Sequence, residues 1–537
     1  MTNGLIEEEL PVISEPKARP RVGFVSLGCP KNLVDSEVMM GLLDRAGAEI
    51  TADAGSAEIL VVNTCSFIDK AKQESVDAIL EMAKLKTEGS AKKLIVAGCL
   101  VERYRDEIQK NIPEVDAVVG TGELEGILAA AGIQMPAVVA PASPFNILSG
   151  NGKGEVRPGR EALAGTHKTA PDAVNFRAEG DRREEQGRFS RATWDGAGAQ
   201  LPQYLYDHTT PRLRATRSAS AYIKIAEGCD HPCSFCVIPN LRGKFRSRRF
   251  ESVVSEAEAL VAEGVREITL IGQDTTCYGE DFGLKDGLAA LLDRLAQLEG
   301  LTWLRFLYAY PNRVTGRLLE TIAKHENICK YLDVPLQHAA VPVLKTMKRG
   351  GGAEIFLKMI EKTRRAVPGI ALRTSFIVGF PGETDADFEA LCDFVAEARF
   401  DWLGVFAYSD EEGSKAFDLE KKVPKRMIEQ RRRALMKLQR GISRQTMRER
   451  VGQEFDVLVE GESEETPLLW EGRTQLHAPE IDGKVYINDF GLLEGVTPGR
   501  FYRCEVTEAH DYDLVARVLG ESLPGEPEEL AAAGVGQ

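Results

Sequence analysis

The first part of the chain alternates short apolar runs with amphipathic stretches. The apolar runs are VGFVSLGC, ILVVNTC and KLIVAGC, which end at Cys29, Cys65 and Cys99. Between them, LVDSEVMMGLLDRAG and FIDKAKQESVDAILEMAKLK repeat apolar residues at intervals of three and four. Runs of strand length that alternate with helical periods predict βαβ units and a parallel sheet.

A second series of apolar runs occupies the middle of the chain and alternates with helical patterns such as ESVVSEAEALVAEG. The runs are REITLIGQD, WLRFLYAYP, YLDVPLQH, LRTSFIVGFPGE and DWLGVFAYSD. This alternation predicts a full or partial TIM-like (β/α) barrel, whose functional residues lie at the carboxyl ends of the strands. Gly272, Gln273, Gly379 and Gly382 fall at such ends. Glycine lets the backbone approach a ligand closely there, although ordinary strand-to-helix turns have the same composition.

The pattern changes once more after residue 449, to short alternating strands separated by Gly and Asp turns. These predict a small all-β barrel of OB-like type. Residues 451–520 contain 15 Asp and Glu and 5 Lys and Arg, which gives this part a formal charge of -10. Such a surface repels phosphate and attracts a basic protein, or serves solvation alone.

At 537 residues the chain is too long for one ordinary core. The predicted class is α/β with an all-β C-terminal part. The expected boundaries are 20–146 for the parallel-sheet domain, 147–214 for a linker, 215–448 for the barrel, 449–520 for the small β-barrel and 521–537 for a tail. Residues 147–214 are polar and lack apolar periodicity, so we expect a disordered connection.

The formal charge of the whole chain is -15, which argues against a surface devoted to nucleic acid, since phosphate binding normally needs a basic face. The N-terminal stretch is acidic and interrupted by proline, unlike a secretory signal. No run approaches the roughly 18 apolar residues of a membrane span. We therefore expect a cytoplasmic protein without a membrane partner.

The ten cysteines of the chain favour metal ligands, catalytic thiols or buried side chains over disulfides in a reducing compartment. Cys29, Cys65 and Cys99 should meet in one crevice, because parallel strands end at the same edge of a sheet. They could equally be buried core thiols. Structural zinc normally takes four ligands, whereas a four-iron cluster held by three thiolates leaves one iron open.

A second set of three cysteines lies in KIAEGCDHPCSFCVIPNLRGKFRSR, where Cys229, Cys233 and Cys236 have the spacing C-x3-C-x2-C. His231 is so near two of them in the chain that it makes a poor fourth ligand, so zinc remains a weaker alternative. The other four cysteines show no ligand spacing and are expected to be buried or incidental: Cys277, Cys329, Cys392 and Cys504.

With Phe235 directly before its last cysteine, this motif resembles that of the radical S-adenosylmethionine (SAM) enzymes. The resemblance implies a [4Fe-4S] cluster on the three cysteines, whose fourth iron chelates the amino and carboxylate groups of SAM. Phe235 would lie against the adenine. The other implied SAM contacts are Gly272, Gln273, Gly379 and Gly382. The C-terminal strands resemble the TRAM domain, which usually binds RNA, although this acidic copy makes tRNA an unexpected partner.

Together the three parts resemble the methylthiotransferases. SLGCPKNLVDSE and AEGCDHPCSFCVIPNLRGKFRSR are similar to members that modify one aspartate of the twelfth protein of the small ribosomal subunit. The tRNA-modifying members tend instead to follow the first cysteine with Gln-Met-Asn, where this chain has Pro30, Lys31 and Asn32. The resemblance implies a second [4Fe-4S] cluster and a catalytic role for all six cysteines, namely Cys29, Cys65, Cys99, Cys229, Cys233 and Cys236.

The implied reaction places a methylthio group on the β-carbon of that aspartate. An electron from the first cluster cleaves SAM, and the 5′-deoxyadenosyl radical removes a hydrogen that no side-chain base could remove. The second cluster supplies sulfur, and a second SAM supplies the methyl group. The implied partners are an electron donor and a basic ribosomal protein attracted by the acidic domain. The alternatives are a tRNA adenosine methylthiotransferase, an iron–sulfur electron carrier or binding protein, and a zinc protein.

Overall fold

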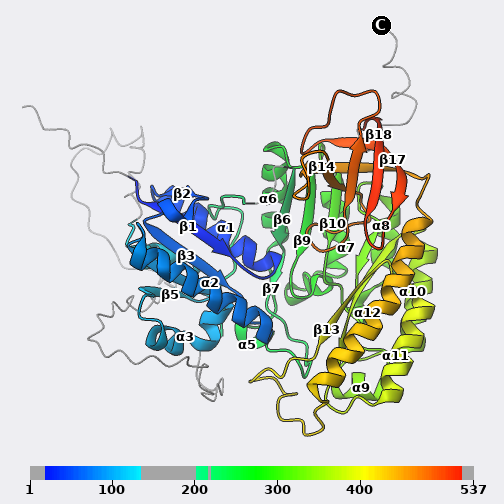
Figure 1. Ribbon diagram of the computed structural model, residues 1–537, viewed down its shortest axis with the longest axis horizontal. Helices are drawn as coiled ribbons and strands as arrows, with labels where there is room; N and C mark the ends of the chain where they lie inside the picture. Colours follow the sequence, from blue (N-terminus) through cyan, green and yellow to red (C-terminus); the bar gives the residue numbers. More distant parts are fainter. Residues whose placement is uncertain (1–18, 135–200, 216–218, 523–537) are drawn as a thin grey trace, which may run out of the picture.

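The computed structural model describes residues 19–134, 201–215 and 219–522, which form three folded parts (Figure 1). The N-terminal part is a parallel sheet in the order β2-β1-β3-β4-β5. Its strands are β1 (Arg21–Ser26), β2 (Glu49–Thr51), β3 (Ile59–Thr64), β4 (Lys93–Gly98) and β5 (Ala117–Val119), and its helices are α1 (Pro30–Arg45), α2 (Asp69–Glu88), α3 (Cys99–Asn111) and α4 (Ile127–Ala131). Val61 of β3 packs with α1, while Leu60 and Val62 pack with α2 and α3. Helices therefore cover both faces, and the predicted βαβ fold is confirmed.

The middle part is an open (β/α) barrel. A parallel bridge between Leu304 and Ile328 joins the sheet β10-β9-β6 to the sheet β11-β12-β13, and within the described residues no pairing joins β6 to β13. The strands are β6 (Ser220–Lys224), β9 (Glu267–Ile271), β10 (Trp303–Phe306), β11 (Tyr331–Asp333), β12 (Ala371–Val378) and β13 (Trp402–Ala407). The partial TIM-like barrel predicted from the apolar runs is confirmed.

Helices alternate with these strands and surround the barrel. They are α6 (Phe250–Ala262), α7 (Gly287–Leu295), α8 (Gly316–Lys324), α9 (Val341–Thr346), α10 (Ala353–Ala366), α11 (Asp385–Ala398) and α12 (Lys425–Arg448). Between β6 and α6, the chain forms the short strands β7 (Ala226–Glu227) and β8 (Arg246–Ser247) and the helix α5 (Ile238–Arg242). The second cysteine set belongs to this excursion.

The C-terminal part is a closed β-barrel in the order β14-β15-β16-β18-β17, as the alternating strands predict. Its strands are β14 (Glu454–Glu462), β15 (Trp470–Arg473), β16 (Val485–Asp489), β17 (Phe501–Ala509) and β18 (Leu514–Glu521). This barrel, at the upper right in Figure 1, covers the amino ends of the central strands. Trp303, which begins β10, packs edge-on against Phe501 at 4.7 Å between ring centroids, and Trp402 Nε1, at the start of β13, donates to the Leu476 carbonyl at 2.8 Å.

Because the acidic C-terminal barrel packs on the amino ends of the central strands, it lies away from the cysteines. A cavity of about 320 Å³ at this junction is lined by Ser220, Arg473 and Lys484, among others. It therefore belongs to the packing between the two barrels and not to the cysteines, which follow the carboxyl ends of strands. The acidic domain and the cysteine sets lie at opposite ends of the central barrel.

Residues 201–215, the end of the expected linker, are part of the described structure and pack between the first two domains. Tyr206 is buried and donates to Glu256 of α6 at 3.3 Å. Arg212 pairs with Glu37 of α1 at 2.5 Å and with Glu256 at 2.6 Å. This segment is ordered because its aromatic and charged side chains find buried partners in both domains. Most of the expected linker, residues 147–200, and most of the tail, residues 523–537, lie outside the described residues.

Among the helices of the described residues, none is both long and apolar enough to cross a membrane.

Candidate active site

The three N-terminal cysteines lie at the carboxyl ends of neighbouring strands. Cys29 follows β1, Cys65 follows β3 and Cys99 follows β4, and these strands are adjacent in the sheet. All three are free thiols; Cys99 is buried and the other two are partly buried. The structure thus gathers this set at one edge of the sheet.

Gly28 and Gly98 explain why two of these cysteines follow a glycine. Both glycines have a left-handed backbone, with φ of 92° and 93°. A Cβ on Gly28 would lie 2.8 Å from the Cβ of Cys65, and a Cβ on Gly98 would lie 2.3 Å from Asn63 Oδ1. Only glycine lets the neighbouring strand ends approach this closely.

Two cations, one from each domain, lie beside these thiols. Burial raises the pKa of Cys99 to about 12, and the charge of Arg242 opposes this rise. The pKa of Cys65 is raised by burial and by the nearby Cys29. Burial also acts to raise the pKa of Cys29, but Lys31 and Arg242 outweigh it and lower that pKa below its usual value. Because metals bind thiolates, these cations favour the ligand form of the set.

The second cysteine set lies in the loop between β7 and α5. The Ile238 backbone N–H points at Cys236 Sγ at 3.5 Å, and the Arg349 guanidinium lies 3.7 Å from Cys233 Sγ. Burial raises the pKa of Cys229 to about 11 and that of Cys236 to about 12. The N–H donors directed at sulfur would stabilise thiolate ligands, as hydrogen bonds do around iron–sulfur clusters.

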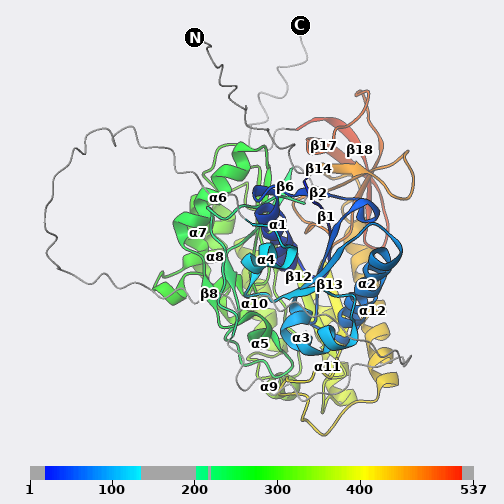
Figure 2. The ribbon, with the colours of Figure 1, turned by 90° about the vertical axis from the view of Figure 1, so that its left-hand side faces the viewer.

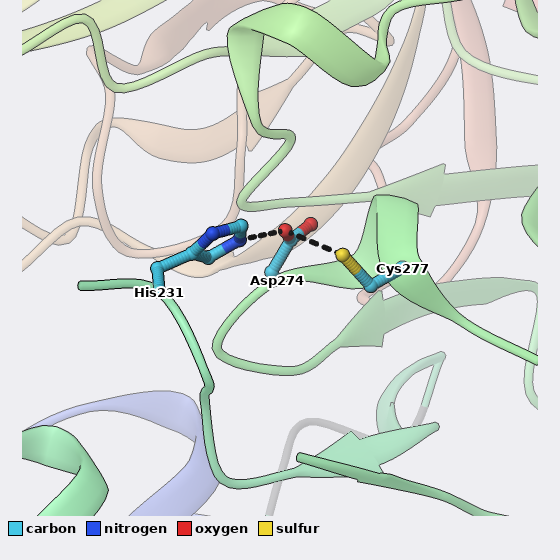
Figure 3. A group of neighbouring side chains, drawn as sticks. All are labelled: His231, Asp274 and Cys277. Atoms are coloured by element: carbon cyan, nitrogen blue, oxygen red, sulfur yellow. Dashed lines mark hydrogen bonds and ion pairs between the residues drawn. The ribbon is translucent and has the colours of Figure 1, made fainter. Parts of the chain in front are cut away.

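His231 fixes this loop to the end of β9 and does not complete a cysteine ligand set. Its Nε2 lies 2.6 Å from Asp274 Oδ2, and the Cys277 thiol donates to the same oxygen at 3.0 Å (Figure 3). The His231 ring stacks on Tyr310 with centroids 3.9 Å apart, and the Cζ of Arg349 lies 4.3 Å from the centroid of that tyrosine. Cys277 therefore has a defined hydrogen-bonding partner. A lone histidine inside the cysteine motif was the only signal of this contact in the sequence.

Cys99 of the N-terminal set lies at the interface between the first two domains, which Figure 2 views with the N-terminal domain in front. Cys99 packs against Val237 and Leu241, in the segment just after the second set. Nearby, Lys31 Nζ donates to the Gly272 carbonyl oxygen, at the end of β9, at 3.5 Å. The carboxyl edge of the N-terminal sheet therefore adjoins the carboxyl end of the barrel.

A buried charge network holds this interface together, and the sequence patterns did not predict it. Arg242 of α5 is 2% exposed and donates to Asp35, to Glu227 at 3.3 Å and to Asn32 at 3.2 Å. Lys224 binds the same two carboxylates, Glu227 at 2.6 Å. Burial acts to raise the pKa of Glu227, but Lys224 and Arg242 outweigh it and hold that pKa at about 2. Both domains thus share one set of buried charges beside the thiols.

Three of the residues predicted to contact SAM lie near the cysteines. Phe235 packs, partly buried, against a small apolar cluster that includes Phe380. Gln273 donates to Glu227 at 2.5 Å, and its own Oε1 is buried without a hydrogen-bond partner among the described residues. The Gly272 carbonyl oxygen faces Lys31. An unpartnered buried oxygen at this position is consistent with a ligand at the mouth of the barrel.

The other two predicted contacts, Gly379 and Gly382, follow β12. Both have a left-handed backbone, with φ of 78° and 87°. A Cβ on Gly379 would lie 2.3 Å from the side chain of Ile428 in α12, whereas one on Gly382 would meet no atom within 4 Å. The packing of α12 is therefore sufficient to require glycine at position 379, without a cofactor.

Each folded part matches a described family. Residues 21–120 match the Uncharacterized protein family UPF0004, residues 223–395 match the Radical SAM superfamily and residues 451–519 match the TRAM domain. The barrel and its cysteine loop thus define a radical SAM enzyme, a class that uses a [4Fe-4S] cluster and SAM.

Curated relatives show which family of radical SAM enzymes the chain belongs to. The chain is 66% identical to the "Ribosomal protein uS12 methylthiotransferase RimO" of Koribacter versatilis over 94% of this chain and 98% of the relative. It is 54% identical to the protein of the same name from Solibacter usitatus, over 96% and 98%, and 45% identical to that from Trichlorobacter lovleyi, over 94% and 99%. The chain belongs to this family of methylthiotransferases, and the resemblance stated from its motifs is confirmed.

Proposed function

We propose that this enzyme adds a methylthio group to the β-carbon of one aspartate of ribosomal protein uS12, in the cytoplasm. Cys229, Cys233 and Cys236 would hold the cluster that binds SAM, and the N-terminal set would hold a second [4Fe-4S] cluster. The observation that supports this most directly is the packing of Cys99, from the N-terminal set, against Val237, which directly follows Cys236 of the other set. A substrate carbon at this interface could reach both groups.

The donor chemistry of each cysteine set fits an iron–sulfur cluster. Thiolates are the usual ligands of such clusters, and three of them leave one iron free for another ligand. Among the described residues, the only three His, Cys, Asp or Glu donors within 4.8 Å of one another are those of His231, Asp274 and Cys277. The two cysteine sets are therefore spaced more widely than a single zinc ion requires, since zinc–sulfur bonds are about 2.3 Å long.

The division of roles follows from the chemistry of an unactivated C–H bond. When bound, the first cluster supplies the electron that cleaves SAM and the second supplies the sulfur, chemistry that no side chain provides. The protein's own residues hold the thiols: Arg242 and Lys31 favour thiolate at the N-terminal set, and Arg349 contacts Cys233. An external electron donor completes the proposed system.

The proposal is tested with protein reconstituted anaerobically with iron and sulfide, then incubated with SAM, a reductant and uS12. We expect uS12 to gain the mass of one methylthio group in place of one hydrogen on a single aspartate. A gain on tRNA adenosine, with none on uS12, would favour the tRNA-modifying alternative. Failure to form 5′-deoxyadenosine under the same conditions would instead favour an electron carrier or binding protein.

We further propose that the acidic TRAM domain attracts the basic ribosomal protein. Because this domain lies at the far end of the barrel from the cysteines, its charge would act by steering the approach of the substrate. Reversing the exposed acids Glu462, Glu464 and Glu465 to lysine should lower kcat/KM for uS12 by about tenfold at low ionic strength, with a smaller loss in high salt because exposed charges are screened.

The matched control reverses three exposed acids of α2, Glu74, Glu81 and Glu88, and so changes the net charge of the chain by the same amount. We expect the control to retain a kcat/KM near that of the wild type. An equal loss in both variants would show that total charge, and not the TRAM surface, governs association.

A further inference from the structure

Lys31 is a buried cation that forms no ion pair with a carboxylate within the described chain. It is 8% exposed and lies in the first turn of α1, two residues after Cys29. Its Nζ lies 3.5 Å from the centroid of the Tyr308 ring and 3.5 Å from the Gly272 carbonyl oxygen. Lys31 thus reaches from the N-terminal domain to the ends of β9 and β10.

The neighbouring buried cations are paired, which makes Lys31 unusual. Arg242 and Lys224 share the carboxylates of Asp35 and Glu227. A buried ammonium without a carboxylate is unfavourable, and a cation in the first turn of a helix also faces the positive end of the helix dipole. The Tyr308 ring, the Gly272 carbonyl and the nearby Cys29 thiol supply only part of the missing negative charge, and in the proposed enzyme that thiol is a ligand of the second cluster. An anion from outside the chain would complete this environment.

The position of Lys31 indicates which anion fits. It lies two residues after Cys29 and reaches Gly272 and Tyr308, at the carboxyl ends of the barrel strands. The second cysteine set is at that end of the barrel, and a substrate carbon must sit there to react with groups held by both sets. In the proposed reaction, the side-chain carboxylate of aspartate is bonded directly to the reacting β-carbon. A cation that holds this carboxylate must therefore lie at the reaction centre. Arg349, another cation at the mouth of the barrel, lies 3.7 Å from Cys233 Sγ and so belongs to the surroundings of the first cluster.

We propose that Lys31 binds the side-chain carboxylate of the substrate aspartate and thereby selects that residue for modification. This inference rests on the proposed function. The ammonium holds the carboxylate by a charge-assisted hydrogen bond and fixes the β-carbon between the cysteine sets. An amide or a neutral side chain in place of the carboxylate loses this bond.

The test compares two peptides that span the modified segment of uS12, one with the aspartate and one with asparagine in its place. Their binding to reconstituted holoenzyme is measured by fluorescence anisotropy for the wild type, Lys31→Met and Lys31→Arg. We expect the wild type and Lys31→Arg to bind the aspartate peptide about tenfold more tightly, and Lys31→Met to bind both peptides equally. Lys70→Met, at an exposed position of α2, is the matched control and should keep the tenfold preference.

Two results with Lys31→Met would overturn the proposal. One is a retained preference for the aspartate peptide. The other is the loss of half of the iron bound by the protein, which would assign Lys31 to the second cluster. Equal affinity of the wild type for both peptides would also overturn the proposal. This comparison needs no variant, so the proposal can be tested even if Lys31→Met does not fold. Conversion of the aspartate peptide by the wild type is measured in parallel. If no methylthio product forms, the proposed function fails, whichever peptide binds better.

Discussion

Replacing Cys65 by alanine will separate two activities of this enzyme: SAM cleavage will remain and methylthio transfer will be lost. Cys65 follows β3, the middle of the three strands that deliver the N-terminal cysteines. Without it, two thiols remain, too few to hold a four-iron cluster in the proposed way. The second cysteine set lies on another domain and keeps all its ligands, so 5′-deoxyadenosine should still form.

The measurements are 5′-deoxyadenosine, methylthiolated uS12 and iron per chain, all on anaerobically reconstituted protein. Iron should fall by about half in Cys65→Ala. Cys392→Ala is the matched control, because this partly buried cysteine of α11 belongs to neither set, and it should retain both activities. Cys233→Ala should lose both. Simultaneous loss of cleavage and transfer in Cys65→Ala would contradict the division of labour between the sets.

The position of the three N-terminal cysteines at one edge of the sheet could be predicted from the local sequence pattern. Each apolar run leaves its cysteine at a carboxyl strand end, and parallel strands that are close in sequence usually lie next to one another. The short strand β2, which lies between β1 and β3 in the chain, pairs on the outer side of β1 and so leaves β1 and β3 adjacent. Cys29, Cys65 and Cys99 therefore meet at one edge without any information from distant parts of the chain. The apolar periods were sufficient for the three folds, because each fold depends mainly on which faces of its elements are buried.

The contacts between domains could not be predicted in this way. Arg242 and Asp35 are separated by 207 residues, and Lys31 and Gly272 by 241. Neither periodicity nor motif spacing specifies which charged side chains become buried together, since a lysine or arginine in a helix normally faces solvent. Gly379 also depends on a distant contact that the sequence did not reveal. Its position after a strand predicts a cofactor contact, and the structure adds a separate reason for glycine, because a Cβ there would meet Ile428.

Replacing Arg242 by methionine will destabilise the protein strongly, because the change breaks a buried charge network and leaves its partners uncompensated. The Arg242 side chain is 3% exposed, as is that of Asp35, and Glu227 is 4% exposed. Removing one partner of a buried ion pair typically costs about 3–5 kcal/mol. Lys224 alone would then face two buried carboxylates, so we expect a loss of this size in the free energy of unfolding, measured by denaturant titration of the reconstituted protein.

Arg105→Met is the matched control for this prediction, since it breaks a pair of the same chemistry at the surface. Arg105 lies 2.6 Å from Glu123, but their side chains are 38% and 44% exposed. Water solvates both charges there, so the loss should not exceed about 1 kcal/mol. Arg242 also lies beside Cys29 and Cys99, so Arg242→Met should bind less iron at the N-terminal set. Equal stability losses in the two variants would mean that burial adds nothing to the Arg242 pair, which contradicts the role assigned to this interface.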